Sequence, residues 1–123
     1  MSALSQFTRK SYINLETFRK NGESIKTPVW FVQQNDLIYV YTSATSGKVK
    51  RIHHNPTVNL VPSNFNGKPQ GTWVPARARE VRDPGIKSLV DQLMGKKYGL
   101  WKRLFFRPSQ ADKNTVLEVK LAG

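Results

Sequence analysis

Residues 27–61, TPVWFVQQNDLIYVYTSATSGKVKRIHHNPTVNLV, hold the pattern that decides the fold of this 123-residue chain. They contain two runs of β-branched and aromatic residues, Thr27–Val32 and Leu37–Thr42, which favour pleated strands. A turn signal, Gln34-Asn35-Asp36, separates the two runs. Pro28 cannot donate to a strand ladder, which predicts a strand start or an unpaired edge at that position.

A short helix and another strand are expected after the second run. Ser46 is a good N-cap, and Lys48–His54 places its apolar residues at helical spacing. Asn55-Pro56 ends the helix, because a residue before proline avoids helical backbone angles. Thr57–Val61 is then predicted to be a strand.

Outward from this stretch, the same patterns continue to both ends of the chain. Tyr12–Phe18 alternates, with Ile13, Leu15 and Thr17 on one face, and is expected to form a meander with the two runs above. The remaining elements are a strand over Trp73–Val81 with Ala76 and Ala78 on one face, a helix over about 84–98 capped by Asp83-Pro84, and a strand over Val116–Leu121. Five or six short strands with one substantial helix predict a mainly β, single-domain barrel over residues 1–123, with helices at its ends.

The composition limits the class of protein and its partners. The 20 Lys and Arg residues exceed the 8 Asp and Glu residues, which gives a net charge of +12 and indicates an anionic partner. The absence of cysteine excludes disulfides, thiolate catalysis and Cys-based zinc sites. No run approaches the roughly 18 apolar residues of a membrane span, and MSALSQFTRK lacks the apolar stretch of a signal peptide, so we expect a cytoplasmic location.

The segment Thr42–Pro56 is a candidate phosphate site. Small hydroxylated residues end a strand, and Gly47 opens the helix with Lys48, Lys50 and Arg51 in its first turns. Helix N-termini present unpaired N–H groups and a partial positive charge to anions. Ser46 and Thr42 can add hydroxyl donors. The alternative is an ordinary capped helix with a solvated basic face, and the spacing of a P-loop is absent.

A second basic cluster, Lys96–Arg107, has the sequence KKYGLWKRLFFR. Basic residues among aromatics suit nucleic-acid binding by phosphate contact and base stacking, and they also suit a membrane surface. The alternative is that the aromatics belong to the core or a subunit interface while the charged side chains stay in water.

Other chemistry finds little support in the sequence. His53 and His54 are adjacent, so they point to different sides of a helix, and no third ligand stands at metal-site spacing. The carboxylates fall in turns, caps and strands without forming a hydrolytic pair. If the protein is an enzyme, a bound cofactor must therefore carry the reaction.

The order of these motifs resembles a known superfamily. TPVWFV, LIYVYT, SGKVKRIHHNPTVNLVP and WVPARAREV together resemble the pyridoxamine 5′-phosphate oxidase-like, FMN-binding split barrels over residues from about 10 to 100. Within that superfamily the chain is similar to the small deazaflavin-dependent enzymes, which use coenzyme F-420. The resemblance implies a six-stranded antiparallel split barrel, Greek-key-like, that forms homodimers with two cofactor sites at the subunit interface.

The resemblance also implies which residues hold the cofactor. The phosphate would be bound by Thr42, Ser46, Gly47, Lys48, Lys50 and Arg51. The ring system would be bordered by Pro28, Val29 and Trp30, with Trp73 and Arg77 facing the same cleft, in one interpretation across the dimer. In the oxidase itself an arginine precedes the helix lysine, whereas this chain has Gly47 there, which counts against simple oxidation of pyridoxamine phosphate.

The resulting hypothesis is an oxidoreductase that moves a hydride between coenzyme F-420 or FMN and an organic substrate. The basic excess favours the more anionic deazaflavin, whose phosphodiester and acidic tail could use both basic clusters. Two alternatives stay open: a nucleic-acid-binding barrel without catalysis, and a relative that binds flavin or haem without turnover.

Overall fold

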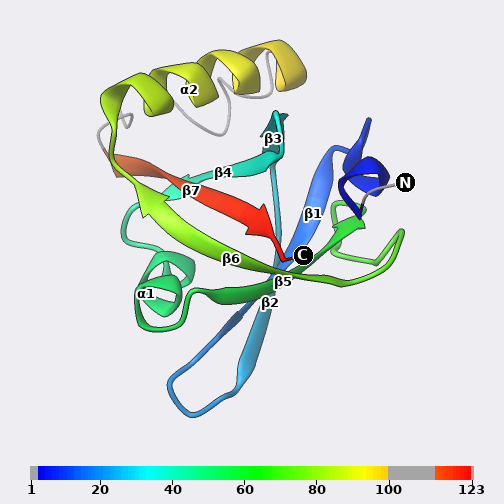
Figure 1. Cartoon of the computed structure of the whole chain (residues 1–123), viewed down its shortest axis with the longest axis vertical. Helices are drawn as coiled ribbons and strands as arrows, with labels where there is room; N and C mark the ends of the chain where they lie inside the picture. Colours follow the sequence, from blue (N-terminus) through cyan, green and yellow to red (C-terminus); the bar gives the residue numbers. More distant parts are fainter. Residues whose placement is uncertain (1–2, 100–112, 123) are drawn as a thin grey trace.

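A computed structural model describes residues 3–99 and 113–122 of the chain (Figure 1). A 3-10 helix, η1 (Ala3–Phe7), comes first. The other elements, in chain order, are β1 (Tyr12–Phe18), β2 (Ser24–Val29), β3 (Phe31–Gln34), β4 (Leu37–Ser43), α1 (Gly47–His54), β5 (Thr57–Ser63), β6 (Val74–Val81), α2 (Pro84–Tyr98) and β7 (Asn114–Leu121).

The seven strands form one antiparallel sheet in the order β2-β1-β5-β6-β7-β4-β3. β2 and β3 lie at opposite edges of this sheet, although Trp30 alone separates them in the sequence. A flat sheet would hold these edges about 29 Å apart at about 4.8 Å per strand, whereas one residue spans at most about 3.6 Å. The sheet must therefore curl until its edges approach, which makes the predicted split barrel.

Two expectations about the first strands were wrong. Thr27–Val32 is not one strand, because the chain leaves β2 after Val29 and enters β3 at Phe31. The first three runs consequently do not form a meander: β2 pairs with β1, while β3 pairs with β4 on the far edge. This break also raises the strand count from the expected six to seven.

The other elements agree closely with the sequence patterns. β1 and α2 have the predicted bounds, and β4, β5 and β7 extend the predicted strands by one or two residues. The carboxylate of Asp83 caps α2 by accepting from the backbone N–H groups of Gly85 and Ile86. The placement of Pro28 at an edge is confirmed, since β2 is the first strand of the sheet.

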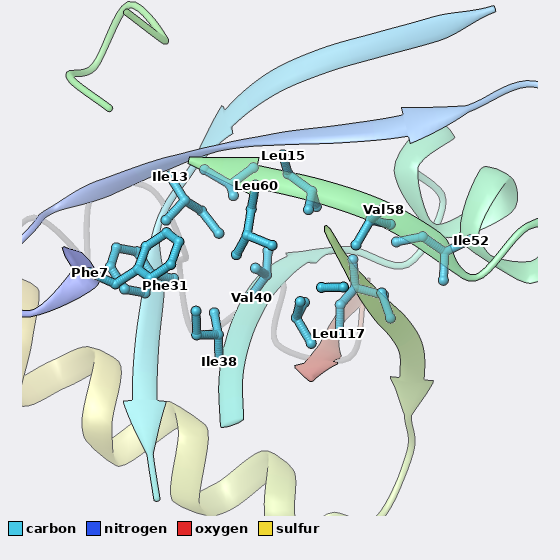
Figure 2. Close-up of a cluster of buried hydrophobic side chains, with 14 of the residues drawn as sticks. Phe7, Ile13, Leu15, Phe31, Ile38, Val40, Ile52, Val58, Leu60 and Leu117 are labelled. Atoms are coloured by element: carbon cyan, nitrogen blue, oxygen red, sulfur yellow. The ribbon is translucent and has the colours of Figure 1, made fainter. Parts of the chain in front are cut away.

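The core has two parts, one inside the barrel and one beneath α2. Figure 2 shows the first, where side chains such as Ile13, Phe31, Val40 and Leu117 point toward one another from different strands. The second packs Val90 and Met94 of α2 against the outer face of the sheet. β4 supplies residues to both parts, Ile38 and Val40 inward and Tyr39 and Tyr41 outward. That double burial explains why the run LIYVYT is apolar and aromatic throughout.

The helices lie at separate ends of the barrel, as Figure 1 shows, with α2 beside β3 and β4 and α1 beside β6 and β1. Phe7 of η1 is fully buried and makes an edge-to-face contact with Phe31, so it closes one end of the barrel core. In the described ranges, none of the helices has the length and apolar character needed to cross a membrane.

Candidate functional site

The split in the barrel forms a pocket of about 270 Å³. β3 pairs with β4 only as far as Val40, so Tyr41–Ser43 of β4 have β7 on one side and no described strand on the other. β2 likewise pairs only with β1 among the described strands. The pocket is therefore bordered by two strand edges that have no described strand beside them. Its lining residues are Tyr12, Pro28, Val29, Trp30, Tyr41, Thr42 and Ser43.

Four of the predicted site residues line this split pocket: Pro28, Val29, Trp30 and Thr42. The sequence patterns did not identify Tyr12, Tyr41 or Ser43. Alternation places a strand residue on a face but does not tell which two strand ends the curl brings together. Ser43 alone carried a usable signal, since it directly follows Thr42 at the predicted strand end.

Tyr41 brings a hydroxyl-bearing side chain that is almost completely buried, at 8% exposure. Burial raises the pKa of Tyr41, and the negative charge of Asp91 on α2 adds to that increase. The phenol therefore stays protonated at neutral pH, as a group that can donate a hydrogen bond.

Helix α1 begins directly beside the pocket. The N–H of Ser46 donates to the carbonyl oxygen of Ser43 at 3.1 Å, which closes a tight turn between the last pocket residue and the N-cap. Ser46 is the N-cap as predicted, but its side chain makes no capping hydrogen bond. Its Oγ is buried and has no partner within the described residues. An unsatisfied buried hydroxyl of this kind calls for a ligand or a bound water.

Lys48 lies half-buried in the first turn of α1 and forms no ion pair with any residue in the described ranges. Burial lowers the pKa of Lys48, and the neighbouring Arg51 guanidinium lowers it further. An ammonium group that is partly desolvated and unpaired gains from an anion placed beside it.

Arg51 folds back over the start of the same helix. Its Nε donates to Oγ1 of Thr17 in β1 at 2.6 Å. A Cβ at position 47 would lie 2.6 Å from Nη1 of Arg51, so glycine is required there unless the guanidinium moves. Burial lowers the pKa of Arg51, and repulsion from Arg19 adds to this. Gly47 thus makes room for a second cation at the helix N-terminus, while Lys50 is exposed.

Trp73 and Arg77 do not line the split pocket within one chain. Trp73 precedes β6 and lies under the ammonium group of Lys26, which is 5.7 Å from the ring centre. Arg77 is exposed on β6, between Thr57 of β5 and Lys120 of β7.

A second groove, of about 360 Å³, lies at the other end of α1. Its central group is the Glu80 carboxylate, which accepts hydrogen bonds from Thr115 at 2.6 Å, His53 at 2.8 Å and Arg82 at 3.2 Å. Burial alone would raise the pKa of Glu80, but these three bonds outweigh it and lower the pKa. Within residues 3–99 and 113–122, no group of three or more potential ligands could hold a metal ion.

Only the start of the second basic cluster falls in the described part of the chain. Lys96 and Lys97 end α2 with exposed side chains, although the amine of Lys97 reaches back to the carbonyl oxygen of Phe31 at 2.8 Å. Residues 100–107 of that cluster lie outside the described ranges.

Taken together, the start of α1 has the chemistry of an anion site. It offers helix N–H groups, an unsatisfied hydroxyl and two partly desolvated cations next to a pocket with an apolar and aromatic lining. Such a combination suits a molecule that carries a flat ring system and a phosphate.

Comparisons with known proteins agree with this geometry. A family model described as Pyridoxamine 5′-phosphate oxidase matches residues 3–123. No curated protein sequence matches the chain.

Several solved structures share the fold at low sequence identity. The haem storage protein HutZ from Vibrio cholerae is 17% identical, with a TM-score of 0.76 over 97% of this chain and 87% of that one. An F-420 reductase is 19% identical, with a TM-score of 0.71 over 100% of this chain and 95% of that one. An FAD-binding protein from Mesorhizobium loti is 16% identical, with a TM-score of 0.69 over 100% and 91% of the two chains.

Proposed function

Because the chain belongs to the pyridoxamine 5′-phosphate oxidase family, we propose that it is an oxidoreductase that uses a phosphorylated flavin-type cofactor, coenzyme F-420 or FMN. The observation that supports this proposal is that the split pocket lies directly beside the start of α1. The pocket at the split adjoins a helix start where, among the described residues, the buried Ser46 hydroxyl has no hydrogen-bond partner and Lys48 forms no ion pair. Two structural relatives, an F-420 reductase and an FAD-binding protein, support the same class of ligand.

The residues divide into a ring site and a phosphate site. Pro28, Val29 and Trp30 would border the ring, and backbone N–H groups at the split would donate to its polar edge. The N–H groups of α1, with Ser46, Lys48 and Arg51, would bind the phosphate, and Thr42 lies between the two sites. The bound cofactor supplies hydride transfer to or from an organic substrate, while the chain binds and orients it.

Charge favours coenzyme F-420 over FMN. The deazaflavin carries a phosphodiester and an acidic tail, and the chain has a net charge of +12. Gly47 occupies the position where the oxidase has an arginine, which argues against simple oxidation of pyridoxamine phosphate. The deazaflavin branch of the family is accordingly our preferred assignment.

We also propose that the working form is a homodimer with the cofactor at the subunit interface. Trp73 and Arg77, which do not line the pocket of their own chain, would then approach the partner's site. Sedimentation at micromolar concentration measures this directly: a dimer supports the assignment, and a monomer that binds cofactor at full affinity contradicts it.

Two other candidate functions are tested by the same experiment. A haem-binding role has a structural relative in HutZ, but the chain has 2 histidines and both end α1, where His53 is bound to Glu80 on the second groove. A nucleic-acid-binding role has the basic charge in its favour, and it predicts affinity for oligonucleotides that falls steeply with salt.

The test combines one spectrum and two titrations. The absorbance of the protein as purified distinguishes haem, flavin and deazaflavin. Titration with FMN and with coenzyme F-420, followed by ring fluorescence, should give micromolar binding to at least one of them. Failure to bind either cofactor, or salt-sensitive binding of an oligonucleotide in their place, would overturn the proposal.

A further inference from the structure

The crossover from β2 to β3 is held by the last turn of α2. At this crossover Phe31 begins an edge strand, so its backbone groups have no further strand to pair with in the described sheet. Two side chains of α2 take that place. The hydroxyl of Tyr98 accepts from the N–H of Phe31 at 3.0 Å, and the amine of Lys97 donates to the carbonyl oxygen of Phe31 at 2.8 Å. The hydroxyl proton of Tyr98 has two acceptors within reach, the carbonyl oxygens of Ser11 at 2.8 Å and of Phe31 at 2.9 Å.

The same tyrosine fixes the aromatic wall of the split pocket. The rings of Trp30 and Tyr98 are stacked, with centroids 4.1 Å apart and an angle of 2° between their planes. Trp30 lines the pocket, whereas Tyr98 is not one of its lining residues. Stacking of this kind contributes about 0.5–1.5 kcal/mol beyond the area that it buries, and the hydrogen bonds to Phe31 and Ser11 keep the tyrosine ring in place.

From this geometry we propose that Tyr98 is a positioning residue of the ring site, which holds the indole of Trp30 in the orientation that forms the pocket wall. The hydrogen bonds to Phe31 fix where the crossover lies, and the stack fixes how the indole is turned. Lys97 supports the arrangement through Phe31, since its ammonium group lies 3.5 Å from the centre of that phenyl ring. The inference about cofactor affinity rests on the proposed function, whereas the inference about Trp30 does not.

The test separates the stack from the hydrogen bonds. Tyr98→Phe keeps the ring and loses the hydroxyl, and Tyr98→Leu loses both. Tyr39→Leu is the matched control, because Tyr39 is a buried tyrosine of the cluster beneath α2 that does not line the pocket. For the quenching readout these variants are made in a chain carrying Trp73→Phe and Trp101→Phe, which leaves Trp30 as the one tryptophan of the 3 in the sequence. Cofactor affinity is measured on the same variants with all three tryptophans present, because Trp73 belongs to the proposed site.

Two readouts are measured on folded protein: acrylamide quenching of Trp30 fluorescence, and affinity for FMN and coenzyme F-420. Tyr98→Leu should expose Trp30 to acrylamide and weaken cofactor binding about 10-fold, the effect of roughly 1.4 kcal/mol. Tyr98→Phe should leave quenching unchanged and weaken binding about 2- to 3-fold, and Tyr39→Leu should change neither readout.

The outcomes distinguish the two levels of inference. Unchanged quenching in Tyr98→Leu, or equal changes in Tyr98→Leu and Tyr39→Leu, overturns the positioning role. Increased quenching of Trp30 with unchanged cofactor affinity also overturns the proposal that Tyr98 is a positioning residue of the ring site. If the wild-type chain binds neither cofactor, the proposed function fails, and quenching alone decides whether Tyr98 orients Trp30.

Discussion

The two ends of α1 face grooves that differ in how their polar groups are satisfied. At the C-terminal end, Glu80 is buried but accepts from Thr115, His53 and Arg82. At the N-terminal end, the Ser46 hydroxyl is buried without a partner, and Lys48 forms no ion pair, among residues 3–99 and 113–122. The Glu80 groove has its central carboxylate paired within the chain, whereas the split pocket lies beside a buried hydroxyl that no described residue pairs.

Size does not indicate which of the two binds a ligand, since the Glu80 groove has a volume of about 360 Å³ and the split pocket about 270 Å³. The distinction lies in the hydrogen bonds and charges. Buried polar groups in folded proteins are normally paired, so an unpaired set beside a pocket indicates where a ligand supplies the missing partners. We therefore propose that the same helix contributes to stability at one end and to binding at the other.

Lys48→Met should produce the largest effect on binding. A hydrogen bond to a charged group contributes about 1.5–3 kcal/mol, so affinity for FMN or coenzyme F-420 should fall about 10- to 100-fold. The melting temperature should stay the same or rise, because the variant no longer buries an unpaired ammonium group. Fluorescence titration and thermal unfolding measure the two quantities. Lys50→Met, at the exposed neighbour, is the control, and a Lys48→Met protein that binds like wild type would contradict the phosphate site.

Glu80→Gln should show the opposite pattern, with lower stability and unchanged binding. Loss of the carboxylate leaves three donors poorly paired, so the free energy of unfolding should fall by about 1–3 kcal/mol. Because the folded-state pKa of Glu80 lies below its ordinary value of 4.5, its contribution is present above pH 4.5 and is lost as pH falls through the folded pKa. Urea unfolding from pH 7 to pH 3 should therefore show a steeper acid loss in wild type than in the variant.

The control for this acid dependence is Glu23→Gln, whose ion pair with Arg19 is exposed on both sides. It should leave stability nearly unchanged. A Glu80→Gln protein that is as stable as wild type, or that loses cofactor affinity, would remove the distinction between the two grooves.

Ser46→Ala should weaken cofactor binding less than Lys48→Met does, and it should change stability less than Glu80→Gln does. A neutral hydrogen bond contributes about 0.5–1.5 kcal/mol, which corresponds to a loss of cofactor affinity of about 2- to 12-fold. Stability should not fall, because the Ser46 hydroxyl has no partner in the described chain. Isothermal titration with the same cofactors measures the change, with the exposed Ser88→Ala as control. A destabilised variant with full affinity would assign Ser46 to the fold.

Lys97→Met should alter the pH dependence of stability, besides removing the contact of Lys97 with Phe31. The Lys97 side chain is exposed as a whole, but its amine lies against Phe31, and this local burial lowers the pKa of Lys97 from 10.5 to about 8. Between these values the unfolded chain holds a proton that the folded chain has released. Wild-type stability should therefore rise with pH from about 8 to 10.5, and the variant should lack this rise. Urea midpoints at pH 7.5 and pH 10 measure it, with the exposed Lys96→Met as control. Parallel pH profiles in wild type and Lys97→Met would contradict it.

The sequence predicted correctly those helices and strands whose bounds depend on local sequence patterns. The helix Pro84–Tyr98 and the strand Tyr12–Phe18 have the predicted bounds, because each carries a complete apolar period with a cap or turn at its end. The start of α1 was also predicted, since Ser46, Gly47 and Lys48 form a local signal.

What the sequence patterns missed depends on contacts between distant segments. Every residue of Thr27–Val32 is compatible with a strand, and the break at Trp30 follows from closure of the sheet. Tyr12 and Tyr41 meet in one pocket although 28 positions lie between them. The side chains that hold the crossover, Lys97 and Tyr98, lie more than 60 residues from Phe31.

The most direct measurement compares FMN with riboflavin, which has the same ring and no phosphate, on wild type and on Lys48→Met. If the start of α1 binds the phosphate, wild type should bind FMN at least 10-fold more tightly than riboflavin, which is about 1.4 kcal/mol. Lys48→Met should remove most of that difference while leaving riboflavin affinity unchanged. Equal affinity of wild type for both compounds, or a preference for FMN that survives in Lys48→Met, would contradict the assignment of this helix as the cofactor's phosphate site.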